Sequence, residues 1–235
     1  MNRNVCAVYL GCIDYERGLG YQDAARQLVQ DGHWDGIVLM LQHDPVITIG
    51  MHGGDTHLLT PAEWLSDHGV PVIHTNRGGD ITCHNPGQLV CYPILNLKKW
   101  KPDVHWYVRT VEDWMIRSLK RVGIRAGRKA VYTGVWAGNQ KIAAVGVGVR
   151  RWITFHGTAL NVCNDLSLFS RIVPCGITEF GVTSIEQQGV HTSADAMVPI
   201  VSEEFTAAFP ATTYTFTTNW GDLYERTNSQ KASLA

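Results

Sequence analysis

The sequence predicts a single domain that mixes α-helices with β-strands, because short apolar runs alternate with stretches of helical spacing. Residues 5–10 have the pattern of a strand, residues 14–30 that of a helix, and residues 36–41 that of a buried strand. A chain of 235 residues is long enough for one sizeable core, and no internal repeat divides it. We therefore expect one domain over residues 1–216.

The clearest helix is predicted from residue 103 to residue 122, where apolar residues recur at helical spacing and the aromatic residues are expected to lie in the core. The apolar residues are Val104, Tyr107, Val108, Val111, Trp114, Met115, Leu119 and Val122. A weaker helix is predicted over residues 192–209, and Pro199 is expected to end or kink it. The polar residues 217–235 are expected to form a loose tail.

A β-hairpin is predicted around Gly138 and Asn139, with strands over residues 131–137 and 140–150. Lys141 then begins the second strand, and alternation of side chains places it on an apolar face. That face holds Ala143, Val145, Val147 and Val149, and the opposite face holds Ala144, Gly146 and Gly148. Glycines inside a strand indicate a bulge or the close approach of a backbone or a ligand. An acyl chain would fit in that space.

The composition is that of a folded globular protein, with 45% hydrophobic and 17% charged residues. The formal net charge of −1 excludes nucleic-acid binding that depends on overall basicity. The N-terminal residues lack a signal-peptide pattern and no apolar run approaches membrane-spanning length, so we expect no membrane association. The six cysteines show no C-x-x-C spacing, which favours reduced thiols in the cytoplasm.

Cys175 is the best candidate for a nucleophile, because a cysteine between Pro174 and Gly176 belongs on a turn or a strand end. Lowering its pKa from about 8.5 to about 6 requires roughly 3 to 4 kcal/mol of thiolate stabilisation. An exposed ion pair supplies at most about 1 kcal/mol. The partner should therefore be partly buried, which favours Lys141 over the lysines of residues 97–101. A buried apolar cysteine and a solvated lysine are the alternatives.

Residues 77–88 form a glycine-rich run that we interpret as a ligand-binding loop leading into a strand. Consecutive glycines let backbone amides approach an oxygen-rich group, and Arg77 is suited to a forked contact with such a group. Hairpins also need glycine for conformational reasons alone, so the run by itself does not establish a site. His84 and His156 are candidate acids or bases, and a purely hydrogen-bonded role is the alternative for each.

Several common chemistries are not indicated. The sequence contains no G-x-x-x-x-G-K-[ST], no H-E-x-x-H and no G-x-S-x-G motif. The spacing of Cys83, His84 and Cys91 matches no common zinc pattern, so we predict no metal site.

Three blocks together resemble the lipoyl(octanoyl) transferases, a family also called lipoate-protein ligase B. The blocks are residues 77–97 (RGGDITCHNPGQLVCYPILNL), 134–161 (GVWAGNQKIAAVGVGVRRWITFHGTALN) and 174–177 (PCGI). Their order and spacing match the family from about residue 37 to residue 209. The resemblance implies an α+β fold, shared with lipoate and biotin protein ligases, in which helices flank a mixed, mostly antiparallel sheet.

The activity that the resemblance implies is transfer of an octanoyl or lipoyl group from acyl carrier protein to a lysine of a lipoyl domain. The acceptors would be 2-oxoacid dehydrogenase subunits and the glycine-cleavage H protein. No cofactor is implied, because the acyl group arrives on the phosphopantetheine of the carrier protein.

The resemblance also assigns site residues by match of motif. Cys175 would carry the acyl thioester, and Lys141 would lower the pKa of its thiol. The implied substrate-binding residues are Arg77, Gly78, Gly79, Asp80, Ile81, Thr82, Cys83, His84, Ala144, Val145, Gly146, Gly157, Thr158 and Ala159.

The sequence departs from the family pattern at four positions. Cys83, Asn85 and Thr158 stand where the family commonly has tyrosine, glycine and leucine. These three substitutions fall in the expected pocket. They therefore affect the expected preference for acyl chain length more than the expected reaction. Cys91 replaces a common glycine and is expected to be structural.

Three other activities remain open from the sequence. A ligase of the same fold would activate a free acid with ATP. A non-catalytic acyl-binding or carrier-binding module would keep the glycine-rich pocket without needing Cys175. A cysteine hydrolase would use His84 or His156 as its base and water as its acceptor.

Overall fold

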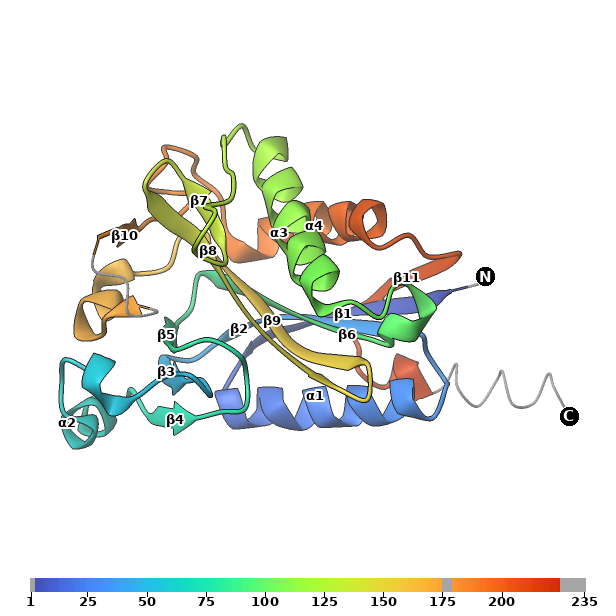
Figure 1. Cartoon of the computed structure of the whole chain (residues 1–235), viewed down its shortest axis with the longest axis horizontal. Coiled ribbons are helices and arrows are strands. Elements are labelled where there is room, and N and C mark those ends of the chain that lie inside the picture. Colours follow the sequence, from blue (N-terminus) through green and yellow to red (C-terminus); the bar gives the residue numbers. More distant parts are fainter. Residues whose placement is uncertain (1–2, 175–178, 225–235) are drawn as a thin grey trace, which may run out of the picture.

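A large mixed sheet forms the centre of the fold in the computed structural model, which describes residues 3–174 and 179–224 (Figure 1). Its strands are β1 (Asn4–Ile13), β2 (Gly36–His43), β6 (Gln88–Leu95), β7 (Val135–Ala137), β8 (Gln140–Arg150), β9 (Ile153–Asn161), β10 (Gly181–Val182) and β11 (Thr213–Thr217). Within the described ranges their order is β10-β8-β9-β6-β2-β1-β11, and β7 pairs with β8 outside this order.

Most neighbours in this sheet are antiparallel, namely β2 with β6, β6 with β9, β9 with β8, and β8 with β7. The parallel pairs are β1 with β2, β1 with β11, and β8 with β10. The expectation of a mixed, mostly antiparallel sheet is therefore confirmed.

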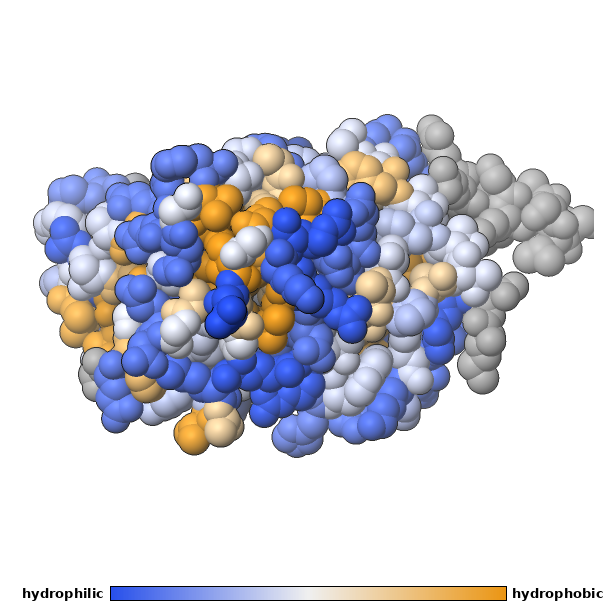
Figure 2. Space-filling model, turned by 90° about the horizontal axis from the view of Figure 1, so that it is seen from above, coloured by the Kyte–Doolittle hydropathy of each residue, from blue (hydrophilic) through white to orange (hydrophobic). Residues whose placement is uncertain are grey.

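Helices cover both faces of the sheet. The helix α1 (Tyr15–Gln30) lies along one face, and α3 (Val104–Arg121) and α4 (Ala194–Ala208) lie together on the other (Figure 1). Each face has its own apolar cluster, so all eight residues of β2 are buried between the two layers. On the α3 side, hydrophobic residues gather at the surface within a hydrophilic surround (Figure 2).

Side-chain caps fix where the three long helices begin. The carboxylate of Asp14 accepts a hydrogen bond from the amide of Arg17 at 2.7 Å, and that of Asp103 accepts one from Trp106 at 3.0 Å. Ser193 caps α4 in the same way. The predicted helix boundaries agree with α1 and α3 within one or two residues. Pro199 lies inside α4 and does not end it, contrary to one of the two expected outcomes.

A second, smaller sheet lies at the end of the molecule away from the N-terminus (Figure 1). It contains β3 (Val46–Ile49), β4 (Val72–His74) and β5 (Ile81–His84) in the order β4-β3-β5. The helix α2 (Ala62–Asp67) and the short 3₁₀ turns η1 (Asp55–His57) and η3 (Leu166–Arg171) pack nearby, and η2 (Leu97–Lys99) follows β6. This sheet presents residues 77–80 to the edge of the large sheet.

The structure corrects two boundaries. The first strand of the hairpin begins at Val135 rather than at residue 131, because Gly134 has a φ of +126°, outside the range of a strand. Part of the expected loose tail is packed, since Trp220 contacts Tyr21 at a ring separation of 4.9 Å and Leu223 is fully buried. The domain therefore includes residues 217–224, and residues 225–235 lie outside the described ranges.

Across residues 3–174 and 179–224, none of the helices has the length and apolar character needed to cross a membrane.

Candidate active site

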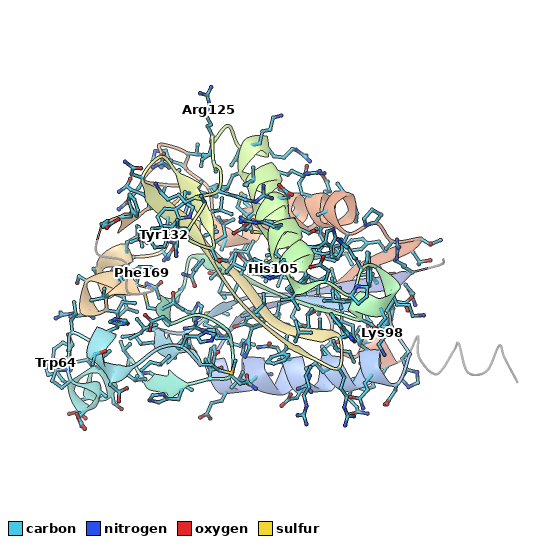
Figure 3. All side chains as sticks on the ribbon, in the orientation of Figure 1. Trp64, Lys98, His105, Arg125, Tyr132 and Phe169 are labelled. Atoms are coloured by element: carbon cyan, nitrogen blue, oxygen red, sulfur yellow. The ribbon has the colours of Figure 1, made fainter. Side chains whose placement is uncertain are left out.

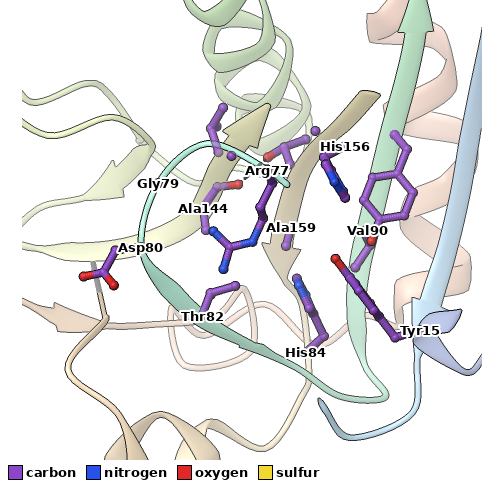
Figure 4. Close-up of a pocket in the computed structure, with 15 residues that line it drawn as sticks. Tyr15, Arg77, Gly79, Asp80, Thr82, His84, Val90, Ala144, His156 and Ala159 are labelled. Atoms are coloured by element: carbon purple, nitrogen blue, oxygen red, sulfur yellow. Dashed lines mark hydrogen bonds between the residues drawn. The ribbon is translucent and has the colours of Figure 1, made fainter. Parts of the chain in front are cut away.

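A pocket opens between residues 77–80 and the strands β5, β6, β8 and β9 (Figure 4). It contains about 470 Å³ of atom-free space, including the part that is open to solvent. Its walls are formed by Tyr15, Arg77, Gly79, Asp80, Thr82, His84, Val90, Tyr92, Ala144, Val145, Gly146, His156, Gly157, Thr158 and Ala159. The segments around residues 80, 145 and 158, which are far apart in the sequence, thus meet at one place.

Three of the predicted substrate-binding residues do not line this pocket. Ile81 and Cys83 point to the other side of β5, where both are buried in the apolar cluster of the small sheet. Thr82 and His84 take the pocket side because side chains alternate along a strand. Gly78 instead donates its amide to the carbonyl of Val147 at 2.9 Å.

The glycines of β8 were expected to allow the close approach of a backbone or a ligand. At Gly146 the backbone of residues 77–80 makes this approach. A Cβ atom there would lie 2.9 Å from the carbonyl oxygen of Gly78, so a larger residue would push residues 77–80 away. Gly148 differs, because the ring of Phe155 fills the space beside it. On the glycine face of β8, the backbone of Gly78 therefore packs on Gly146, and the side chain of Phe155 packs on Gly148.

Arg77 makes a forked contact, but its partner is inside the protein. Its Nη2 donates to the carbonyl and the hydroxyl of Thr48 at 2.6 and 2.9 Å, and its Nε donates to the same hydroxyl at 3.2 Å. The fork that the structure shows is thus made with β3, and a contact of Arg77 with a ligand stays a prediction. The guanidinium fixes residues 77–80 against the small sheet and forms part of the pocket wall.

The inner part of the pocket contains histidine and tyrosine rings. The sequence did not predict that these rings lie close together. Tyr92 donates its hydroxyl to Nε2 of His43 at 2.8 Å, and His43 donates Nδ1–H to the carbonyl of Ile13. His84 donates Nδ1–H to Oε1 of Gln88 at 2.6 Å. Tyr15 stacks on His84 with a ring separation of 6.0 Å. Tyr15, Val90 and Tyr92 had no local motif that marked them as pocket residues.

Burial keeps these imidazoles neutral. Loss of hydration lowers the pKa of His84 and of His156 to about 3, and that of His43 to about 4. In the unfolded chain the same groups have a pKa of about 6.5. The pocket is thus lined by uncharged rings at neutral pH.

These shifts predict acid destabilisation. Between pH 6.5 and the folded-state pKa values the unfolded chain binds protons that the folded chain does not, so the stability is complete above about pH 6.5 and falls as the pH drops. Each such histidine contributes a slope of up to about 1.4 kcal/mol per pH unit. Urea unfolding at several pH values should show a smaller slope for His84→Gln than for the unsubstituted protein. Equal slopes would contradict a neutral, buried His84.

Lys141 lies in a second, smaller cavity that adjoins the first. The residues around it are Thr82, Gln88, Lys141, Ala144, Ala159, Asn161, Phe169, Pro174 and Val182. Thr82, Ala144 and Ala159 line both cavities, so the two cavities adjoin at these residues. Lys141 is 6% exposed, which agrees with the predicted burial, and its Nζ lies 5.0 Å from the centre of the Trp136 ring. Phe169 and Tyr132 lie at this end of the molecule, far from Lys98 (Figure 3).

A β-bulge turns Lys141 toward the smaller cavity. Trp136 pairs with Lys141 and Val135 pairs with Ala143, so Ile142 has no partner of its own on β7. Ile142 and Ala143 both enter the apolar cluster beneath α3, whereas Lys141 and Ala144 share the cavity. The predicted placement of Lys141 on the face of Ala143 is therefore wrong, because alternation does not hold across a bulge.

A buried carboxylate supports the chain behind Lys141. Glu112 on α3 is fully buried and accepts hydrogen bonds from Arg109, from Arg128 and from the amide of Gly134, each at 2.9 Å. A Cβ atom on Gly134 would lie 3.4 Å from Cε of Lys141. The carboxylate thus holds residue 134 against the stem of the lysine.

Cys175 lies outside the described residues, but the segments on either side of it are anchored at the site. Before it, the amide of Val173 donates to the carbonyl of His57 at 2.8 Å, and Nδ1 of His57 lies 2.5 Å from Oδ2 of Asp80. After it, the amide of Thr183 donates to the carbonyl of Lys141 at 3.0 Å. Pro174, its immediate neighbour in the chain, lines the cavity of Lys141.

The sequence is similar to a known protein family over most of its length. A family model described as the lipoyl protein ligase A/B catalytic domain matches residues 14–206. An octanoyltransferase from Thermoanaerobacter sp. (strain X514) is 47% identical over 201 residues, which are 85% of this chain and 88% of the relative. An octanoyltransferase from Clostridium kluyveri is 45% identical over 197 residues, which are 84% of each chain.

Solved structures share the fold at low sequence identity. Lipoate-protein ligase A bound with ATP superposes with a TM-score of 0.75 at 18% identity, over 97% of this chain and 94% of that chain. A bipartite lipoate protein ligase from Thermoplasma acidophilum gives a TM-score of 0.71 at 18% identity, over 97% and 91% of the two chains. The expected catalytic fold is therefore confirmed.

Proposed function

This chain belongs to the lipoyl protein ligase A/B catalytic domain family and is an octanoyltransferase, and we propose that the octanoyl group passes through a thioester on Cys175. One observation carries this proposal. Pro174, which directly precedes Cys175, lines the same cavity as the buried Lys141, and that cavity adjoins the pocket of the glycine-rich loop. This supports a site in which a cation and a space for an acyl chain lie beside the residue that precedes the proposed nucleophile.

In the first half reaction the thiolate of Cys175 attacks the carbonyl carbon of the incoming thioester. A new carbon–sulfur bond forms, the bond to the donor sulfur breaks, and protonated Lys141 gives its proton to the departing thiolate. Backbone amides near Gly79 or Gly176 stabilise the developing oxyanion. Gly79 lines the pocket, and Gly176 lies outside the described residues.

In the second half reaction neutral Lys141 takes a proton from the lysine of the acceptor. A free lysine has a pKa of about 10.4 and is mostly protonated at neutral pH, so it needs this step before it is nucleophilic. Its neutral amine attacks the Cys175 thioester, the amide bond forms as the carbon–sulfur bond breaks, and the Cys175 thiolate leaves. The second proton of the attacking nitrogen passes to water. Lys141 is then protonated again and ready for the next donor.

The burial of Lys141 supports its role beside the thiolate. An exposed ion pair is screened by water and contributes at most about 1 kcal/mol. At 6% exposure the ammonium is shielded from bulk water, which strengthens its attraction to a neighbouring thiolate. This is the partly buried partner that a thiolate at neutral pH requires.

The donor and acceptors belong to the proposal as well. The donor is octanoyl-acyl carrier protein, whose phosphopantetheine delivers the acyl group, so no further cofactor takes part. The acceptors are lipoyl domains of 2-oxoacid dehydrogenase subunits and the glycine-cleavage H protein. A cytoplasmic location is supported by the described cysteines, which are all free thiols, because a reducing compartment preserves them.

The hydrolase alternative is disfavoured by the histidines. His84 and His156 do not line the cavity of Lys141 and Pro174, and a pKa of about 3 makes each a weak base at neutral pH. A ligase would have the same fold, but it differs from the proposed transferase in that it needs ATP.

The test of this function is transfer in a mixture of the protein, octanoyl-acyl carrier protein and an apo lipoyl domain without ATP. We expect the mass of the lipoyl domain to increase by one octanoyl group on its acceptor lysine. Transfer that requires ATP and free octanoate would support the ligase instead. Release of octanoate without acylation of the acceptor would support the hydrolase.

A further inference from the structure

His156 forms part of the wall between two spaces. One is the pocket beside residues 77–80, which we call the acyl pocket, and the other is a separate open groove. The groove contains about 1000 Å³ of atom-free space, including open solvent, and lies between α1 and residues 74–76. Gln22, Asn76 and Phe155 line the groove but not the acyl pocket, whereas His156 lines both spaces. In Figure 4, His156 and Tyr15 lie on the side of the pocket away from Asp80.

His156 also lies at the end of the pocket that is farther from Lys141. The cavity of Lys141 shares Ala159 with the acyl pocket but does not include His156. His156 and Ala159 are three positions apart on β9, which is a distance of about 10 Å. An extended octanoyl chain has seven carbon–carbon bonds of about 1.5 Å and spans roughly 9 Å. An acyl chain that starts at the shared wall beside Ala159 therefore ends near His156.

The backbone and two hydrogen bonds hold the ring of His156 in place. Its φ of +54° is rare for a residue other than glycine, especially inside a strand. Its amide donates to Oε1 of Gln22 at 2.7 Å, and its Nε2–H donates to Oδ1 of Asn76 at 2.8 Å. Nδ1 is buried and accepts no hydrogen bond from any residue of the described ranges. Strained conformations of this kind cluster at functional sites.

We propose that His156 is the end stop of the acyl pocket and limits the length of the acyl chain that the enzyme accepts. The proposal rests on the proposed octanoyl transfer. A chain longer than eight carbons would have to displace the ring, lose the bond to Asn76 and enter the groove behind it. Removing the ring would connect the pocket with the groove and admit longer chains.

The variant that tests this is His156→Gly, because glycine adopts a φ of +54° without strain while the ring is removed. The measurement is the rate at which Cys175 is acylated by octanoyl and by dodecanoyl thioesters of the carrier, read from the mass of the intact protein. We expect the dodecanoyl-to-octanoyl rate ratio to rise by at least about tenfold, which is the discrimination that a single methylene supports.

Phe155→Ala is the matched control, since Phe155 precedes His156 on β9 and lines only the groove. Its ratio should equal that of the unsubstituted protein. If His156→Gly does not fold, His156→Asn provides the same test, because asparagine tolerates positive φ and is shorter than histidine.

An unchanged ratio in the folded variant would overturn the end stop, and so would an equal rise in Phe155→Ala. Failure of the proposed transfer has a different signature, because the unsubstituted protein would then not be acylated by the octanoyl donor. The two hypotheses are therefore tested separately by one set of mass measurements.

Discussion

Replacement of Lys141 by alanine is expected to reduce octanoyl transfer by a factor of about 10² to 10⁴, the range typical for loss of a general acid or base. The ammonium is buried at a cavity that adjoins the acyl pocket, so neither water nor another lysine takes its place easily. Both half reactions use its proton, and both should become slow. The measurement is the rate of thioester formation in a single turnover, followed by the rate of transfer to the lipoyl domain.

Lys129→Ala is the control for this variant. Its Nζ lies 5.3 Å from the centre of the same Trp136 ring, but Lys129 does not line either cavity. The control should retain most of the activity. Equal rates for Lys141→Ala and the unsubstituted protein would exclude the proposed role of Lys141.

Lys141→Arg would separate the two roles. Arginine remains protonated at all relevant pH values, so it attracts a thiolate but does not accept a proton from the acceptor lysine. We expect thioester formation to be impaired less than transfer from the thioester to the lipoyl domain.

Replacement of Cys175 by alanine is expected to abolish the acyl-enzyme and to reduce transfer by a factor on the order of 10³ or more, as for other nucleophiles. Cys83 and Cys91 are no substitute, because burial raises the pKa of both thiols. Cys12 is more exposed, but partial burial and the nearby Asp44 raise the pKa of its thiol as well. These groups remain protonated and weakly nucleophilic at neutral pH.

The control variants are Cys12→Ala and Cys163→Ala, which remove the two described cysteines that are not fully buried. Both should form the acyl-enzyme at the normal rate. A Cys175→Ala protein with normal transfer would show instead that the chain binds acyl groups or uses another nucleophile.

The sequence predicted the hairpin and the burial of Lys141, because the turn at Gly138 and the apolar pattern of β8 are local features. It did not predict the face on which Lys141 lies. The bulge at Ile142 depends on pairing with β7 and has no signature in a strand that is apolar on nearly every residue. One extra residue in a strand moves the side chains that precede it to the opposite face of the sheet, and Lys141 precedes the bulge.

Long-range contacts explain the other differences. Tyr15 comes from the start of α1 and reaches the pocket only when the helix packs on the sheet, so no spacing rule relates it to His84. Arg77 was expected to contact a ligand, and its fork closes on Thr48 because β3 and residues 77–80 lie side by side. Ile81 and Cys83 were assigned to the site as part of a continuous run, whereas a strand presents only every second residue to a pocket.

The central claim is that an octanoyl group is carried on Cys175, and the most direct test is the mass of the protein after it is mixed with octanoyl-acyl carrier protein. We expect an increase of one octanoyl group, located on the peptide that contains Cys175 and removed by hydroxylamine, which cleaves thioesters. Transfer of octanoate to the lipoyl domain without any such adduct, or an adduct on another residue, would contradict the claim.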